Sequence, residues 1–137
     1  MKQKILLADD DPSIIETFSE IIRKNFLDYG LETFQNGIFL KRRLEERTED
    51  VGIAITDHQM PVYNNQIPRI DGDEMVRDYA KRVPMLMVYG GHKSIGEQAI
   101  KDGAFGYLLK PTKSQHYITA VETVLYYSVN NGKRKIN

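Results

Sequence analysis

Four acidic residues and one lysine are of the types, and in the places, that phosphoryl chemistry needs. They are the triplet Asp9-Asp10-Asp11, Asp57 and Lys110, which occur at or close behind the ends of short apolar segments. Adjacent carboxylates repel one another and require a cation or hydrogen-bond donors. Carboxylate and carbonyl oxygens are the ligands that Mg²⁺ prefers, usually beside water and a phosphate oxygen, and a lysine neutralises phosphate charge. The set predicts phosphoryl transfer to a carboxylate, with Asp57 as nucleophile.

These residues meet only if the apolar segments before them are parallel strands. Consecutive apolar residues predict buried strands at Lys4–Ala8, Gly52–Thr56, Met85–Val88 and Gly106–Leu109, and a more polar edge strand at Leu31–Phe34. Helical spacing predicts helices over Ser13–Leu27 and around Phe39–Leu44, Met75–Ala80, Ile95–Ile100 and Ile118–Leu125. This alternation predicts an α/β fold, a doubly wound five-stranded parallel sheet with five helices on its two faces. Ligands then bind beyond the carboxyl ends of the strands.

Local signals mark the ends of these elements. Asp11 suits the N-cap of the first helix, Pro12 suits its first turn, and Gly30 suits its stop. The charged residues between Lys41 and Arg47 are expected to form a solvated helix face. The polar, basic end of the chain, residues 130–137, is expected to be loose.

Length and composition limit the classes of function. The chain has 137 residues, 41% of them hydrophobic, which predicts one soluble domain with its own core. Lys+Arg and Asp+Glu number 19 each, so the formal net charge is zero and nothing favours a nucleic-acid partner. The absence of cysteine excludes disulfides, thiolate nucleophiles and thiolate metal sites. No apolar run suits a membrane span or a signal peptide, so a cytoplasmic protein without a membrane partner is expected.

Three motifs together resemble the response-regulator receiver domain of two-component signalling. They are Asp-Asp-Asp-Pro at 9–12, Thr-Asp-x-x-Met-Pro at 56–61 and Gly-Tyr-Leu-Leu-Lys-Pro at 106–111. The resemblance runs from about Lys4 to about Tyr127, so 1–127 is expected to be the receiver domain. Residues 128–137 are then the end of the last helix and a polar, basic tail. The resemblance implies a flavodoxin-like sheet with strand order 2-1-3-4-5.

The same resemblance implies a role for each site residue. Asp57 accepts a phosphoryl group from the phosphohistidine of a sensor histidine kinase or a histidine phosphotransfer protein, and Lys110 contacts that group. The implied Mg²⁺ ligands are Asp10, Asp57 and the backbone carbonyl of Gln59, with Asp9 holding the metal's waters. The Lys110–Pro111 bond is implied to be cis. The expected function is that of a single-domain response regulator, a phosphoacceptor signalling protein rather than an enzyme, which acts by conformational change or phosphorelay.

The end of the fourth predicted strand departs from the receiver pattern. Five residues after Pro84, where the family has a threonine or serine that bonds the phosphoryl group, this chain has Tyr89. A phenol is too long for that place, so Tyr89 is expected to swing out of the site, to cover it, or simply to pack outward. Tyr107 matches the family's aromatic switch residue. The usual threonine–tyrosine switching through Tyr107 is therefore not expected in its ordinary form. A conformational shift on phosphorylation is expected at the face of the fourth helix, fifth strand and fifth helix.

The loop after the phosphoacceptor also departs from the pattern. Nine residues, Val62–Ile70, separate Pro61 from Asp71-Gly72, where the family usually has two. This loop is expected beside the site, where it shields an aspartyl phosphate, recognises a partner, or is a tolerated insertion.

Two other classes of function compete with a phosphorylatable receiver. A degenerate receiver, acting as a phosphorylation-independent interaction module, is favoured by Tyr89 and the long loop. The retained Asp9, Asp10, Asp57 and Lys110 oppose it. An aspartyl-nucleophile phosphatase or a nucleotide-binding enzyme lacks its motifs here, since neither Asp-x-Asp-x-Thr nor a phosphate-binding glycine loop occurs.

Overall fold

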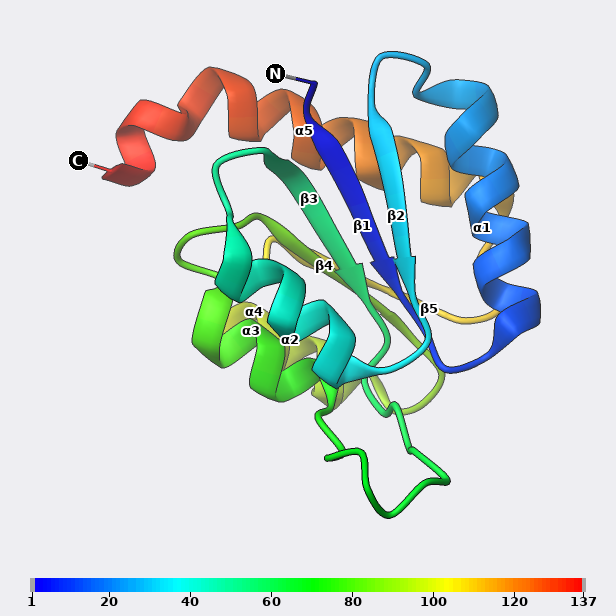
Figure 1. Cartoon of the computed structure of the whole chain (residues 1–137). Helices are drawn as coiled ribbons and strands as arrows, with labels where there is room; N and C mark the ends of the chain where they lie inside the picture. The colour runs from blue at the N-terminus through cyan, green and yellow to red at the C-terminus, as the bar shows by residue number, and fades with distance from the viewer. Residues whose placement is uncertain (1, 137) are drawn as a thin grey trace.

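The computed structural model describes the backbone of residues 2–136 and the side chains of residues 2–128. Its five strands form one parallel sheet in the order β2-β1-β3-β4-β5 (Figure 1). The strands are β1 (Lys4–Ala8), β2 (Gly30–Phe34), β3 (Val51–Thr56), β4 (Met85–Tyr89) and β5 (Gly106–Leu109). This confirms the predicted fold class and the strand order, including the polar strand β2 at an edge.

Five helices cover the two faces of the sheet. They are α1 (Pro12–Asn25), α2 (Gly37–Glu46), α3 (Gly72–Tyr79), α4 (Lys93–Lys101) and α5 (Ser114–Ile136). Helices α1 and α5 lie on one face, and α2, α3 and α4 lie on the other (Figure 1). The predicted stop at Gly30 is wrong, because α1 ends at Asn25 and Gly30 begins β2. The predicted loose tail falls on residues whose side chains lie outside those described.

The core divides into two apolar layers because strand side chains alternate between faces. In β1, Leu6 and Ala8 pack on the face covered by α2, α3 and α4, called here the α2–α4 side. Ile5 and Leu7 pack on the face covered by α1 and α5, the α1–α5 side. In β4 the same alternation sends Tyr89 to the α2–α4 side. No helix among the described residues has both the length and the apolar character that crossing a membrane requires.

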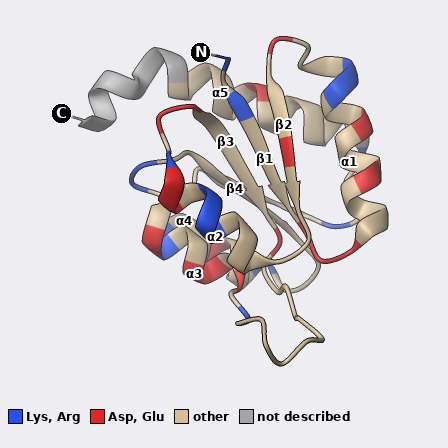
Figure 2. Cartoon of the chain, in the orientation of Figure 1, with Lys and Arg blue, Asp and Glu red and all other residues tan. Residues whose placement is uncertain are grey.

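One predicted surface residue of α2 is buried instead. Figure 2 shows Lys and Arg interspersed with Asp and Glu over the helices, as the zero net charge suggests. Arg43, however, is only 8% exposed, so the prediction of a solvated face is wrong at this position. Its guanidinium donates to Glu32 Oε1 and to Asp50 Oδ2, both at 2.8 Å, and to the carbonyl oxygen of Arg47. This network ties α2 to β2 and to the start of β3, which explains why a charge is buried there.

Candidate functional site

The strand register brings the predicted site residues to one edge of the sheet. Ala8 pairs with Thr56, so Asp9 and Asp57 leave the sheet side by side, and the Asp57 N–H donates to the Ala8 carbonyl at 3.1 Å. On the other side of β3, the Lys110 N–H donates to the carbonyl of Tyr89 at 2.7 Å, which extends the pairing of β4 with β5. All three groups therefore follow the carboxyl ends of parallel strands.

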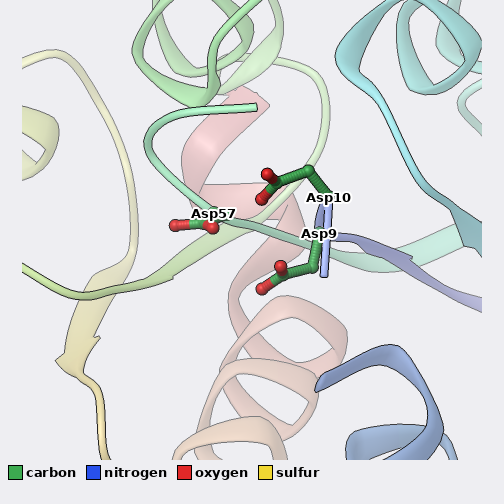
Figure 3. Close-up of side chains that lie close together, drawn as sticks. All are labelled: Asp9, Asp10 and Asp57. Carbon is green, nitrogen blue, oxygen red and sulfur yellow. The ribbon is translucent and has the colours of Figure 1, made fainter. Parts of the chain in front are cut away.

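The side chains at this edge converge on a common space. Figure 3 shows Asp9 and Asp10 from the end of β1 facing Asp57 from the end of β3, and one carboxylate oxygen of each lies within 4.8 Å of the others. The Lys110 Nζ donates to Asp9 Oδ2 at 2.6 Å and to Asp57 Oδ2 at 3.1 Å. The Lys110–Pro111 bond is cis, as the resemblance implied. The predicted grouping is thus observed, while the chemical role of each residue stays a prediction.

The charges in this cluster are unbalanced. Burial, and then the charge of Asp9, raise the pKa of Asp57, although Lys110 opposes this shift. Burial and the charge of Asp9 likewise raise the pKa of Asp10. Burial alone lowers the pKa of Lys110, but its hydrogen bonds and ion pairs with Asp9 and Asp57 raise it overall. Three crowded carboxylates with a single lysine are a donor set that fits a hard divalent cation such as Mg²⁺.

Asp11 and Gln59 closely follow cluster residues in the sequence. Asp11 is the N-cap of α1, as predicted, because its Oδ1 accepts from Ser13 N at 2.9 Å and from Ser13 Oγ at 2.7 Å. These hydrogen bonds lower the pKa of Asp11. Gln59 is exposed in the loop two residues after Asp57, and its implied role as a carbonyl ligand remains a prediction.

Tyr89 neither covers the site nor packs outward, so those two expectations are wrong; its hydroxyl is directed out of the site and into α4, as the first alternative predicted. Its side chain is 0% exposed and points to the α2–α4 side of the sheet. The hydroxyl donates to the His92 carbonyl at 2.6 Å and accepts from Gly96 N at 2.7 Å, at the start of α4. Burial raises the pKa of this phenol. The half-buried ring of Tyr107 lies 6.2 Å from the Tyr89 ring, and its implied role as a switch remains untested.

The long loop after Asp57 extends away from the sheet edge (Figure 1). Tyr63 is 93% exposed, so this segment does not form a cover in the described conformation. The base of the loop is closed by Asp71, whose Oδ1 accepts from Met60 N and from Arg69 Nε, each at 3.0 Å. Asp71 is the N-cap residue of α3, but its side chain makes no capping hydrogen bond and closes the loop instead. Sequence reasoning misses this contact, because a lone aspartate before a helix reads as a cap.

Gly72 is the residue that lets this loop return so close to Asp57. A Cβ at this position would lie 1.9 Å from the Asp57 carbonyl oxygen. We therefore expect Gly72→Ala to lower the free energy of unfolding by about 1–3 kcal/mol, as overpacking does. Urea titration measures this change. Gly90→Ala is the matched control, because a Cβ there meets nothing within 4 Å. Equal midpoints for the two variants would contradict the prediction.

Comparison with known proteins agrees with this geometry. The sequence model of the response regulator receiver domain family matches residues 5–122 of this chain. The response regulator protein TodT of Pseudomonas putida is 24% identical over 123 residues, which cover 88% of this chain and 50% of TodT. The chain thus spans about half the length of this curated relative.

Solved structures show the same fold. A response regulator receiver domain protein from Clostridium thermocellum superposes with a TM-score of 0.79 at 22% identity, covering 92% of this chain and 96% of that one. A response regulator from Burkholderia pseudomallei, solved with a phosphorylated aspartic acid, a calcium ion and citrate, gives a TM-score of 0.70 at 16% identity. That match covers 95% of this chain and 72% of the other. By its family match, its fold and the acidic cluster with its lysine, the chain belongs to the response regulator receiver domain family.

Proposed function

We propose that the protein is a single-domain response regulator in which Asp57 accepts a phosphoryl group from a phosphohistidine donor. The observation that carries this proposal is the position of Lys110, whose Nζ contacts Asp9 and Asp57 at the same time. A cation held at the acceptor carboxylate is suitably placed to neutralise the incoming phosphoryl oxygens. The Burkholderia pseudomallei neighbour, solved with a phosphorylated aspartic acid and a calcium ion, supports the formation of an aspartyl phosphate on this fold.

The acidic cluster fits a divalent cation that assists the transfer. Asp10 and Asp57, with the backbone carbonyl of Gln59, are the proposed ligands, and Asp9 is proposed to hold the metal's waters. A bound Mg²⁺ would neutralise charge on the transferred group. The raised pKa values of Asp10 and Asp57 support this assignment, since burial and the neighbouring Asp9 charge disfavour their anions when no divalent cation is present.

In the proposed step, a carboxylate oxygen of Asp57 attacks phosphorus. The new O–P bond forms as the P–N bond of the phosphohistidine breaks, and its electron pair leaves with the imidazole, which takes up a proton. Lys110 donates to a phosphoryl oxygen during the transfer. The chain mainly positions the groups and balances their charge, which is how phosphoryl transfer is generally catalysed.

The partners and setting belong to the same proposal. The phosphodonor is a sensor histidine kinase or a histidine phosphotransfer protein, and the protein acts in the cytoplasm as a signalling acceptor, with neither a nucleic acid nor a membrane as its partner. It signals by conformational change or by passing the phosphoryl group on. The curated relative is about twice as long, so independent action of this domain is proposed and not inherited from that relative.

Intact mass spectrometry after incubation with acetyl phosphate and Mg²⁺ tests the proposal. We expect an adduct of one phosphoryl group in the wild type, its loss in Asp57→Asn, and its loss when EDTA removes the metal. Asp11→Asn is the matched control, because Asp11 caps α1 and lies outside the cluster. This variant should label like the wild type.

A wild-type protein that stays unlabelled under these conditions would overturn the proposal. The alternative, an interaction module that works without phosphorylation, would then be favoured. One observation already favours that alternative: the Tyr89 hydroxyl is engaged with α4, so the end of β4 offers no side-chain hydroxyl to a phosphoryl group.

A further inference from the structure

The first turn of α4 has a side chain built into its hydrogen bonding. In a regular helix the Gly96 N–H would bond to the His92 carbonyl four residues earlier. Here the Tyr89 hydroxyl accepts from Gly96 N at 2.7 Å and donates to the His92 carbonyl at 2.6 Å. The phenol oxygen thus bridges the Gly96 N–H and the His92 carbonyl, and this carbonyl also accepts directly from Ile95 N at 3.1 Å. Insertion of a side chain into this ladder is a recognised way to alter a helix locally.

The start of α1 shows the ordinary arrangement in the same molecule. The carbonyl of its N-cap residue, Asp11, accepts directly from the N–H groups of Ile14 and Ile15, both at 3.1 Å. The insertion at α4 follows from the position of Tyr89 at the last residue of β4, with its ring directed to the α2–α4 side. Its hydroxyl both donates and accepts, so the buried phenol has partners for both functions.

Tyr107 packs against the same turn from β5. A Cβ on Gly96 would lie 2.2 Å from Tyr107 Cγ, so the Tyr107 ring rests directly on the helix backbone where Gly96 has no side chain. The fully buried Tyr89 ring lies 6.2 Å away, between centroids. The two rings and Gly96 therefore interlock β4, α4 and β5.

The group formed by the two rings and Gly96 is connected to Asp57 through His58. The backbone N–H of His58 donates to Asp57 Oδ1 at 2.7 Å, and the His58 ring approaches the Tyr89 ring edge-on, with 6.1 Å between centroids. Asp57 and Tyr89 are thus separated by one residue, His58. The Tyr89 hydroxyl is directed away from Asp57 and into α4.

We propose that Tyr89 is a positioning residue whose hydroxyl fixes the first turn of α4 to the end of β4. With Tyr107 seated against Gly96, it holds the α4–β5 surface in one position whether or not Asp57 carries a phosphoryl group. The second half of this inference rests on the proposed function. It places any phosphorylation-dependent rearrangement elsewhere, for example in the β3–α3 loop, which follows Asp57 directly.

Amide hydrogen exchange by NMR on the full chain tests the first half. Tyr89→Phe keeps the ring but removes the bridging oxygen, so we expect exchange at residues 95–97 to accelerate about tenfold or more while β1 and β3 stay unchanged. Tyr79→Phe is the matched control. Tyr79 is also buried in the α2–α4 layer, and no hydrogen bond of its hydroxyl is found among the described residues. Unchanged exchange in Tyr89→Phe would overturn the inference.

Gly96→Ala provides an independent test that does not depend on the folding of Tyr89→Phe. The added Cβ should displace the Tyr107 ring and remove its NOE contacts to α4, while exchange at position 96 changes less than about twofold. Persisting Tyr107 contacts to α4 would show that the ring is not seated on this glycine.

The second half is tested by labelling with acetyl phosphate and Mg²⁺. We expect exchange in the first turn of α4 to change less than about twofold on labelling of the wild type, and about tenfold on labelling of Tyr89→Phe. An equally large change in both proteins would overturn the inference that Tyr89 holds the α4–β5 surface in one position. If the wild type does not label, only the proposed function is overturned. The comparison of the wild type with Tyr89→Phe, both without acetyl phosphate, still decides the role of the hydroxyl.

Discussion

Replacing Lys110 with methionine is expected to slow labelling of Asp57 by acetyl phosphate by about 10- to 150-fold. In the structure the Lys110 Nζ contacts both Asp9 and Asp57, and it is the cation within hydrogen-bond distance of the acceptor. A hydrogen bond between charged groups contributes about 1.5–3 kcal/mol, which corresponds to that range of rates. Loss of the lysine also removes a charge that opposes the raised pKa of Asp57, so the pKa of this carboxyl should rise further.

The rate of adduct formation at saturating Mg²⁺ measures this effect. Lys113→Met is the matched control, since Lys113 is exposed just beyond Pro111 and makes the same change of charge. We expect this control to label like the wild type. A Lys110 variant as fast as Lys113→Met would show that the lysine does not stabilise the transferred group.

Replacing Arg43 with methionine is expected to lower the free energy of unfolding by about 3–5 kcal/mol, the usual cost of breaking a buried ion pair on one side. Asp50 is 0% exposed and depends on Arg43 at 2.8 Å, with Arg47 at 3.2 Å as its second partner. Urea denaturation measures the loss. Arg42→Met is the control: it removes an exposed charge from the same helix and should change stability by less than about 0.5 kcal/mol.

The pH dependence of stability identifies the cause of that loss. Burial by itself raises the pKa of Asp50, but Arg43 and then Arg47 lower it below the ordinary 3.8. A lowered pKa contributes stability above pH 3.8 that disappears as the pH falls through the folded-state value. Without Arg43 this contribution should shrink, so the stability of the variant should fall less steeply in acid. Parallel curves for variant and wild type would contradict the assignment to this pair.

The sheet and the acidic edge could be predicted because their signals are local. Consecutive apolar residues define strands buried on both faces, and parallel order then carries Asp9, Asp57 and Lys110 to one edge without any knowledge of packing. The helix start at Asp11 was equally readable, since a cap depends on neighbours only two or three residues away.

The features that the sequence did not reveal depend on contacts between distant segments. Arg43 is of the same residue type as its exposed neighbour Arg42, and its contacts with Asp50 and Glu32, which are distant in the sequence or outside the helix, distinguish the two. The length of the Tyr89 side chain does not indicate its direction, whereas its place in β4 does. Met85 and Met87, which lie on the same face of the strand, face the layer into which Tyr89 packs. Attention to that place would have predicted its inward direction.

The closed base of the loop between β3 and α3 has a consequence for engineering. Asp71 joins the two ends of the loop, because it accepts hydrogen bonds from Met60 and Arg69, and α3 begins at Gly72. The residues between these two ends therefore do not set the position of Asp57. The exposed tip of the loop around Tyr63 is therefore a suitable position for grafting an epitope, a fluorophore or a binding peptide near the acidic cluster without changing the residues that build it.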